Sequence, residues 1–289
     1  MGGSINQNVL ATLEVDRPLE SMLAFGKERQ DIYNKKESGQ KWPWTEDPTL
    51  QHYKFCNIFR DQDKTTQSIV EWVKPLNSLE TRVTNLVYAR MCNNMDVINK
   101  TGYIGSISPE DFIAIIDEIG GGKTKAKVNK NSVWKDPYQI SGTFKKRLNL
   151  PYREHVIAYH LPKTANALTK VIVNNKGVED LTQVLEELNT AWGYRMNMVF
   201  TQVLLDLSIT NPEIVSSEAT YPLGDGATPV INLLNNVTLN EIVDAWSKQY
   251  PDERQLKPMD AEQLLCEWRK YLVWGNNLAK KRRIYRKPK

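Results

Sequence analysis

Six apolar side chains recur every three or four residues in the segment RMNMVFTQVLLDLSI, which spans residues 195–209. They are Met196, Val199, Phe200, Val203, Leu204 and Leu207. This period places all six on one broad face of an α-helix, and such a face must be covered by other apolar elements. Segments with the same period recur along most of the chain, whereas alternating apolar and polar runs, typical of strands, are scarce. The sequence therefore predicts a mainly α fold.

Capping residues, prolines and glycines divide this pattern into separate helices. Ser78 and Ser108 are predicted N-caps, Pro109 suits a first helical position, and Thr45 or Asp47 is expected to cap the helix that starts at Pro48. Helices are predicted over 9–38, 48–61, 65–76, 78–94, 108–119, 177–192, 195–209 and 259–275. Residues 121–155 are polar and irregular, and the stretch GTFKKRLNLPYREH within them is predicted to be extended.

The length of 289 residues and the hydrophobic content of 40% are those of a globular protein with a sizeable core. We expect a single helical domain over 1–279, with an irregular excursion at about 120–160, followed by a tail at 280–289. The three widely separated cysteines give no disulfide framework and favour a reducing, cytoplasmic location, the host cytoplasm if the gene belongs to a phage. No apolar run reaches membrane-spanning length, so no membrane partner is predicted.

The net charge of +4 is concentrated at the C-terminus. The tail KKRRIYRKPK holds seven basic residues and no acidic residue, which leaves 31 basic against 34 acidic side chains in the remaining chain. Clustered cations favour a polyanion through counterion release, and Lys280, Lys281, Arg282 and Arg283 are the predicted contacts to a DNA backbone. The alternative is a solvated tail without a partner.

Two other motifs carry little functional weight. GGGKTK at 120–125 lacks the first glycine of a phosphate-binding loop, because Asp117 stands in its place, and the preceding segment reads as helix. His155 and His160 are five residues apart, a poor spacing for two metal ligands on one helical face, and His52 stands alone. No metal site is predicted.

A polar row follows the aromatic-rich stretch KWPWTEDPTLQHYKF. Asn57, Arg60 and Asp63 are spaced i, i+3 and i+6, so on a continuous helix they share one narrow face. One reading is a simple ion pair between Arg60 and Asp63. The other is the wall of a ligand pocket, because aromatic side chains such as Trp44 commonly line sites for bases and flat ligands.

A second polar pair lies on the apolar helix at 195–209. Gln202 and Asp206 are one turn apart, and an acid and an amide on such a helix need partners. They are predicted either to form hydrogen bonds within the core or to present a carboxylate in a cleft that faces the loop Gly224-Asp225-Gly226.

The stretch PWTEDPTLQHYKFCNIFRDQDKTTQ resembles the pattern PWT-DP-L--Y-F-N--R--D--T of the phage alpha-glutamyl/putrescinyl thymine pyrophosphorylase family. WGYRMNMVFTQVLLDL is similar to that family's glycine turn and following helix, and DAEQLLCEWRKY with KKRRIY is similar to its C-terminal helix and basic tail. The resemblance implies a helical fold akin to helix-hairpin-helix DNA glycosylases. It also implies amino acid:DNA transferase activity on DNA with a modified thymine, and a relationship to the helical domain of 5-hydroxymethyluracil DNA kinases.

Under this resemblance, a free amino acid is the co-substrate, and its amine displaces pyrophosphate from pyrophosphorylated 5-hydroxymethyluracil. Three tasks then need side chains. Trp44 and Asn57 are expected to hold the flipped base, with Gln202, Gly224 and Asp225 as further substrate contacts. Arg60, Arg82 or Arg90 is expected to neutralise the leaving pyrophosphate. Asp206 or Asp63 is expected to accept the proton of the amine. No other cofactor is implied.

Other functions fit the same sequence. One alternative is a glycosylase-like or kinase-associated domain that acts on 5-hydroxymethyluracil DNA. Another is a DNA-binding module without catalysis, which uses the basic tail and the helical body, and the weakest is a helical scaffold that binds only protein.

Overall fold

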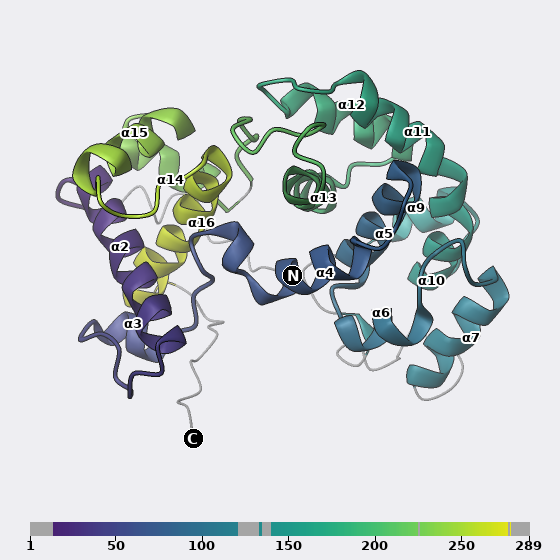
Figure 1. Ribbon diagram of the computed structural model, residues 1–289, viewed down its shortest axis with the longest axis horizontal. Coiled ribbons are helices and arrows are strands. Elements are labelled where there is room, and N and C mark those ends of the chain that lie inside the picture. Colours follow the sequence, from purple (N-terminus) through teal and green to yellow (C-terminus); the bar gives the residue numbers. More distant parts are fainter. Residues whose placement is uncertain (1–13, 121–132, 135–139, 225, 277, 279–289) are drawn as a thin grey trace. The chain divides into compact units, whose positions relative to one another are not determined.

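The computed structural model describes residues 14–120, 133–134, 140–224, 226–276 and 278. The regular secondary structure of these residues is helical, without a β-strand, which confirms the predicted mainly α fold. The helices gather into two compact units (Figure 1). Unit 1 is Lys64–Ala219, and unit 2 combines the chain before Lys64 with the chain after Ala219. A division by contacts does not establish independent folding, so the single domain predicted over 1–279 stays a prediction.

Unit 1 is organised around α5 (Leu79–Cys92), in which every residue from Val83 to Cys92 is buried. Ser78 caps this helix as predicted, because its Oγ accepts from the backbone N of Thr81 at 3.0 Å. Helix α5 contacts α4 (Lys64–Val73), α6 (Met95–Thr101), α11 (Leu161–Asn174) and α13 (Asn197–Thr210). Because α5 is buried on all sides from Val83 to Cys92, this part of the helix needs no polar stripe that faces solvent.

The remaining helices of unit 1 surround this centre. They are α7 (Pro109–Ile119), α9 (Gly142–Arg147), α10 (Arg153–His155), the π-helix η2 (Val156–His160) and α12 (Thr182–Trp192). Ser108 caps α7 as predicted, with its Oγ 3.0 Å from the N of Asp111. The extended conformation predicted for 142–155 is wrong, because Ser141 caps α9 through the N of Thr143 and this helix buries Phe144. The rest of the predicted excursion, at 121–132 and 135–139, lies outside the described residues.

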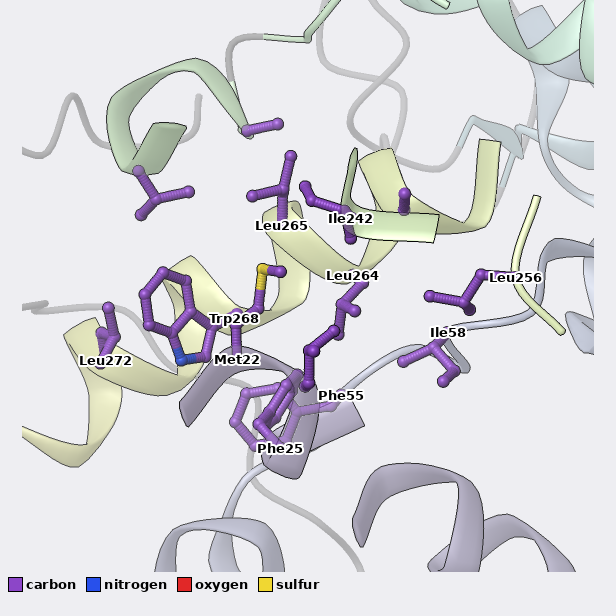
Figure 2. Close-up of a cluster of buried hydrophobic side chains, with 14 of the residues drawn as sticks. Met22, Phe25, Phe55, Ile58, Ile242, Leu256, Leu264, Leu265, Trp268 and Leu272 are labelled. Carbon is purple, nitrogen blue, oxygen red and sulfur yellow. The ribbon is translucent and has the colours of Figure 1, made fainter. Parts of the chain in front are cut away.

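Unit 2 is organised around α16 (Pro258–Gly275), which packs against α2 (Pro18–Glu37), α3 (Pro48–His52), α14 (Thr228–Ile231) and α15 (Leu239–Gln249). Figure 2 shows Leu264, Leu265, Trp268 and Leu272 of α16 within an apolar cluster that includes Met22 and Phe25 of α2. Gly26 permits this close approach, because a Cβ there would lie 2.9 Å from Leu264 Cδ1. The apolar face predicted for 259–275 is therefore confirmed as core.

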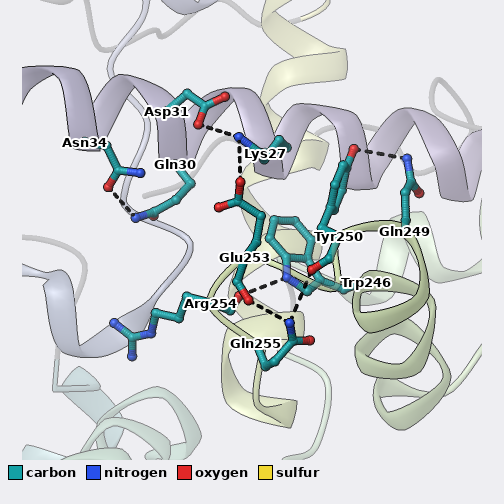
Figure 3. Close-up of polar contacts among 10 residues, drawn as sticks. All are labelled: Lys27, Gln30, Asp31, Asn34, Trp246, Gln249, Tyr250, Glu253, Arg254 and Gln255. Atoms are coloured by element: carbon teal, nitrogen blue, oxygen red, sulfur yellow. Dashed lines mark hydrogen bonds and ion pairs between the residues drawn. The ribbon is translucent and has the colours of Figure 1, made fainter.

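The segment between α15 and α16 is tied to α2 by polar contacts. Figure 3 shows Lys27 Nζ between the carboxylates of Asp31, at 2.6 Å, and Glu253, at 3.1 Å. The indole Nε1 of Trp246 donates to the backbone O of Arg254 at 3.0 Å. These contacts fix the chain just before α16 and so set the position of the first turn of that helix.

Two predicted helices end or begin elsewhere. Within the described residues the first helix begins at Pro18 and residues 14–17 are not helical, whereas residues 9–13 of the predicted helix lie outside the described residues. The helix predicted over 48–61 ends at His52, and Tyr53 is extended with φ −107° and ψ 149°. A short 3-10 turn, η1 (Arg60–Gln62), follows. Asn57, Arg60 and Asp63 therefore do not form one row on a continuous helix, and that premise is wrong.

The extended conformation after His52 has a physical cause in unit 2. Phe55, Ile58 and Phe59 are all buried in the core of unit 2, but a helical face would also suit this spacing, so apolar burial alone does not decide the conformation. The backbone N–H groups that a helix would have used bind carboxylates of α16 instead. Tertiary contacts thus outweigh the local helical pattern in this segment.

Candidate functional site

One face of α16 carries a row of polar side chains opposite its apolar face. Its members, spaced i, i+3, i+7 and i+10, are Asp260, Gln263, Glu267 and Lys270. The first three are buried, and Lys270 is half-buried. Glu267 Oε1 accepts from Gln263 Nε2 at 3.1 Å and from Lys270 Nζ. A buried row of this kind is stable only when its groups are bound to one another or to the backbone.

The extended segment after α3 completes this row. The backbone N of Cys56 donates to Glu267 Oε2 at 2.9 Å, and the backbone N of Arg60 donates to Asp260 Oδ1 at 2.8 Å. The Arg60 side chain also reaches α16, because its Nη1 donates to Gln263 Oε1 at 2.9 Å. The structure therefore places the predicted catalytic residue Arg60 against α16, at a half-buried position.

The glycine loop lies on the same helix. The backbone N of Gly224 donates to Glu262 Oε1 at 3.2 Å. A Cβ at Gly226 would lie 2.5 Å from Cys266 Sγ, so only glycine fits at this position without displacing the loop. Asp225, the third predicted member of the loop, lies outside the described residues. Glu262 thus binds the Gly224 backbone, and the positive charge of Arg60 lowers the pKa of the same carboxyl.

The titratable groups of this site have shifted proton affinities. Burial raises the pKa of Asp260 to about 6, against hydrogen bonds from the backbone N of Arg60 and Lys257 that lower it. Burial also raises the pKa of Glu262, while the nearby Arg60 opposes that change. Burial works against the Lys270 ammonium, but the adjacent Glu267 carboxylate raises the pKa of Lys270, so this amine stays charged at neutral pH.

The two thiols at this site are poor nucleophiles. Burial raises the pKa of Cys266 to about 12, and the Glu267 charge together with burial raises the pKa of Cys56. Because the thiolate is the reactive form, both cysteines stay protonated near neutral pH. The site therefore holds two protonated thiols and, in Glu262, a carboxylate whose pKa is raised by burial and lowered by Arg60.

The other predicted residues of unit 2 are held in various ways. Asn57 Oδ1 accepts from Arg29, and its Nδ2 donates to the backbone O of Gln62 at 2.9 Å, so this amide ties the segment to α2 and η1. Asp63 is the C-cap of η1, where its backbone N donates to the backbone O of Arg60, and the residue is half-buried. Trp44 is only 5% exposed, with its Nε1 2.7 Å from the backbone O of Gln40. An edge of Trp44 lines an open hollow in unit 2.

Asp206 and Arg90 form a buried pair in unit 1. Arg90 Nε donates to Asp206 Oδ2 at 2.7 Å, and Arg90 Nη2 donates to Asp206 Oδ1 and, at 3.0 Å, to Thr66 Oγ1. The exposed fractions are 0% for Asp206 and 2% for Arg90. Of the two readings that the sequence left open for Asp206, this geometry favours the hydrogen bond within the core.

Arg82 and Gln202 also belong to unit 1. Arg82 donates to Asn211 Oδ1 and to the backbone O of Leu76, both at 2.7 Å, and so joins the ends of α13 and α4. Gln202 is half-buried on α13, one turn before Asp206. The substrate roles assigned to these residues from the sequence stay predictions, as do the roles of Asp206 and Arg90.

A tight turn joins α12 to α13 in unit 1. Gly193 adopts a left-handed conformation with φ +83°, and the backbone N of Met196 donates to Asn189 Oδ1 at 2.6 Å. Met196 provides no side-chain cap to α13. Arg147 donates to the backbone O of Gly193, and both Arg147 and Arg195 are exposed. The turn therefore presents two guanidinium groups to solvent.

Sequence reasoning did not single out Asp260, Glu262, Gln263, Glu267 or Lys270 as site residues. A signal was available, because the polar residues of α16 recur with the same period as its apolar face. The tail residues Lys280, Lys281, Arg282 and Arg283 lie outside the described residues. In the described part of the chain, no helix is long and apolar enough to cross a membrane.

Comparison with known proteins gives one family. No curated protein and no solved structure matches the chain. A family model described as the helical domain of 5-hmdU DNA kinase matches residues 17–277, which include both units and every described element. Residues 17–277 are most of the chain, and the chain therefore belongs to the family of 5-hmdU DNA kinase helical domains.

Proposed function

We propose that this protein binds DNA that carries a modified 5-hydroxymethyluracil and transfers an amino acid amine onto that base. The observation that supports the proposal is the site on α16, where Arg60 binds Gln263 and Glu262 binds the Gly224 backbone, within a family named for 5-hmdU DNA. The finer assignment to amino acid transfer rests on the resemblance of residues 43–67 to the thymine pyrophosphorylase pattern.

The reaction requires one bond to form and one to break. The amine nitrogen forms a bond to the 5-methylene carbon of the base, and the bond from that carbon to the pyrophosphate oxygen breaks. Pyrophosphate leaves with the electron pair of the broken bond, and the nitrogen loses a proton. The protein must therefore stabilise a developing anion and accept one proton.

Arg60 is suited to stabilise the negative charge that develops on the leaving pyrophosphate. Its guanidinium is half-buried, is oriented by Gln263 and carries a permanent charge. A planar guanidinium can donate two hydrogen bonds to a phosphate group, which favours Arg60 over a lysine in this position. Lys270 adds a second positive charge on the same helix, although Glu267 partly balances it.

Glu262 is suited to accept the proton that the amine nitrogen loses. A general base works best when its pKa lies near the working pH, and burial moves the pKa of Glu262 in that direction. Glu262 is not fully buried as a residue, and its Oε1 accepts from the backbone N of the Gly224 loop. Asp206, the carboxylate preferred from the sequence, is fully buried and bound on both oxygens by Arg90, which leaves no lone pair directed at solvent. Glu262 therefore replaces Asp206 in our proposal, and Asp63 stays a second candidate.

Two basic parts of the protein are proposed to bind the phosphates of the DNA backbone. One is the α12–α13 turn with Arg147 and Arg195, where the uncapped first turn of α13 adds backbone N–H groups that attract phosphate. The other is the tail at 280–289. Contacts of both kinds position DNA without reading its sequence.

The test is a reaction of DNA that contains pyrophosphorylated 5-hydroxymethyluracil with a mixture of amino acids, followed by digestion and mass spectrometry of the nucleosides. We expect a new nucleoside whose mass exceeds that of 5-hydroxymethyldeoxyuridine by one amino acid residue. Glu262→Gln should abolish it while DNA binding persists, and Asp244→Asn, an exposed change on α15 of the same unit, should leave it unchanged. Unmodified nucleosides with every donor would contradict the proposal.

The family description favours a second candidate, a helical domain that recognises 5-hmdU in DNA for a kinase reaction. This function predicts tighter binding to DNA with 5-hydroxymethyluracil than to DNA with thymine, and no new nucleoside with any amino acid. Incubating DNA that contains unphosphorylated 5-hydroxymethyluracil with a nucleoside triphosphate separates the two, because only a kinase reaction would yield the phosphorylated base.

A further inference from the structure

Gln263 lies within the polar row on α16, and its neighbours fix the direction of its side-chain amide. Its Nε2 donates to Glu267 Oε1 at 3.1 Å, and its Oε1 accepts from Arg60 Nη1 at 2.9 Å. A guanidinium only donates hydrogen bonds, and a carboxylate only accepts them. An amide turned the other way would present its N–H groups to Arg60 and its oxygen to Glu267, so both bonds would be lost.

The Glu267 carboxylate is itself held by several donors. Its Oε1 accepts from Lys270 Nζ as well as from Gln263, and its Oε2 accepts from the backbone N of Cys56 at 2.9 Å. Glu267 is 1% exposed, so these bonds are shielded from competing water. Burial works against the Lys270 ammonium, but the Glu267 charge raises the pKa of Lys270, and the amine stays charged at neutral pH.

Stability alone does not account for a buried pair of this kind. The cost of taking both charges out of water offsets their attraction, so apolar side chains of similar volume would serve stability as well. The pair of Glu267 and Lys270 supplies something that apolar side chains would not, which is a fixed acceptor for the Gln263 amide. Without that acceptor the amide would have no preferred direction.

Arg60 depends on this direction because α16 holds it at both ends. Its backbone N donates to Asp260 Oδ1 at 2.8 Å, and its guanidinium donates to Gln263. The arginine side chain is long and loses much rotamer freedom when it is fixed. The bond to Gln263 therefore helps to set where the positive charge lies. A charge that stabilises a leaving group is effective when it is in place before the reaction.

We propose that Glu267 and Lys270 are positioning residues, which hold the Gln263 amide in the one orientation that keeps the Arg60 guanidinium fixed on α16. That this guanidinium meets pyrophosphate rests on the function proposed above; its orientation by Gln263 and Glu267 does not.

The first test follows the Nε–H signal of the Arg60 guanidinium by NMR in the full-length chain labelled with nitrogen-15. Gln263→Met removes the acceptor and should shift this signal toward that of a mobile arginine. Glu267→Met with Lys270→Met removes both charges together, which favours a folded variant, and should cause the same shift although Gln263 is unaltered. The triple variant should match Gln263→Met, because Glu267 then has no amide to act through.

Two results would overturn the proposal. One is an Arg60 signal that the double change leaves in place. The other is a larger shift in the triple variant than in Gln263→Met, which would mean that Glu267 acts through its bond to the Cys56 backbone. Arg17→Gln with Glu20→Gln removes an exposed ion pair from the start of α2 and is the matched control, which should leave the signal unchanged.

Hydrogen exchange in the unaltered protein gives a check that needs no variant. The Nε2 protons of Gln263 should exchange with solvent at least tenfold more slowly than those of the exposed Gln40. Equal exchange at the two side chains would show that Glu267 does not hold the Gln263 amide, and would refute the proposal even where a variant failed to fold.

Inorganic pyrophosphate separates this proposal from the proposed function. Calorimetry should show that Gln263→Met and the double change at Glu267 and Lys270 each weaken pyrophosphate binding at least threefold, and that Arg60→Gln weakens it at least as much. Equal binding by Arg60→Gln and by the unaltered protein would refute the role proposed for Arg60 in the transfer reaction. The orientation of Arg60 would still be decided by its NMR signal.

Discussion

The Arg90 guanidinium holds both oxygens of the Asp206 carboxylate in the interior of unit 1, with Nε 2.7 Å from Oδ2. The two residues lie on α5 and α13, so the pair joins helices that are distant in sequence. Buried pairs of this geometry contribute little net stability, but the removal of one partner leaves an uncompensated charge. This asymmetry gives the pair a distinct mutational signature.

We therefore predict that Asp206→Leu destabilises unit 1 by about 3–5 kcal/mol, the usual cost of a buried, unpaired charge. The double variant Arg90→Met with Asp206→Leu should recover most of this loss, because both charges are removed together. Urea unfolding measures each free energy. Glu71→Gln, which breaks the exposed pair of Glu71 with Lys74, is the control and should change little. A double variant as unstable as the single one would contradict a role as a paired charge.

Asp260 predicts a pH dependence of stability. Its pKa is about 6 in the folded protein and 3.8 in its ordinary environment. Because the folded pKa is raised, the contribution of this group to stability is full below pH 3.8 and is lost as the pH rises through 6. The shift corresponds to about 3 kcal/mol at 1.36 kcal/mol per pKa unit.

The measurement is the difference in unfolding free energy between the unaltered protein and Asp260→Asn from pH 4 to pH 7. Relative to this variant, the unaltered protein should lose about 2 kcal/mol over that window, because part of the change lies below pH 4. Other groups titrate in both proteins and cancel in the difference. A flat difference would mean that burial does not raise the pKa of Asp260.

The close packing of Gly226 against Cys266 predicts that a second substitution can restore the stability lost when Gly226 is replaced. A Cβ at this position would lie 2.5 Å from Cys266 Sγ, so Gly226→Ala should displace the loop from α16 and lower the melting temperature by several degrees. Adding Cys266→Ala removes the sulfur and should restore much of the loss. Gly224→Ala meets Glu262 Oε1 at 2.9 Å and should not be rescued by the same change, which makes it the matched comparison. Rescue of both variants, or of neither, would contradict the packing described for the loop.

Much of the fold could be predicted from the sequence because its helices carry local signals. Ser78 and Ser108 cap helices where expected, and the apolar faces of α13 and α16 are buried. Helix α15 was not predicted, although Thr238 and Glu241 form a capping box at its start. The segment after His52 could not be predicted, because its conformation depends on carboxylates that lie 200 and 211 residues further along the chain.

The candidate site was predictable only in part, for a related reason. Arg60 and the Gly224 loop were identified from local composition and from the resemblance, but their partner Glu262 lies on a helix whose apolar face dominates its pattern. Asp206 shows the same limit for a residue that was singled out. A lone acid on an apolar helix suggests function, yet its partner Arg90 comes from another helix, and a sequence cannot show which two helices pack together.

The α12–α13 turn and the tail predict separable contributions to DNA binding. Each phosphate contact made by a cation adds about 0.9 to the slope of log affinity against log salt concentration. Arg147→Gln with Arg195→Gln removes two exposed guanidinium groups and should reduce the magnitude of that slope by about 2, with equal weakening for every DNA sequence. Removal of residues 280–289 should reduce it further.

Fluorescence anisotropy at several salt concentrations measures the slopes. Lys248→Gln, near the end of α15 in unit 2, removes a lysine that is assigned to no DNA contact and should leave the slope unchanged. An unchanged slope in the double variant would show that DNA does not contact this turn.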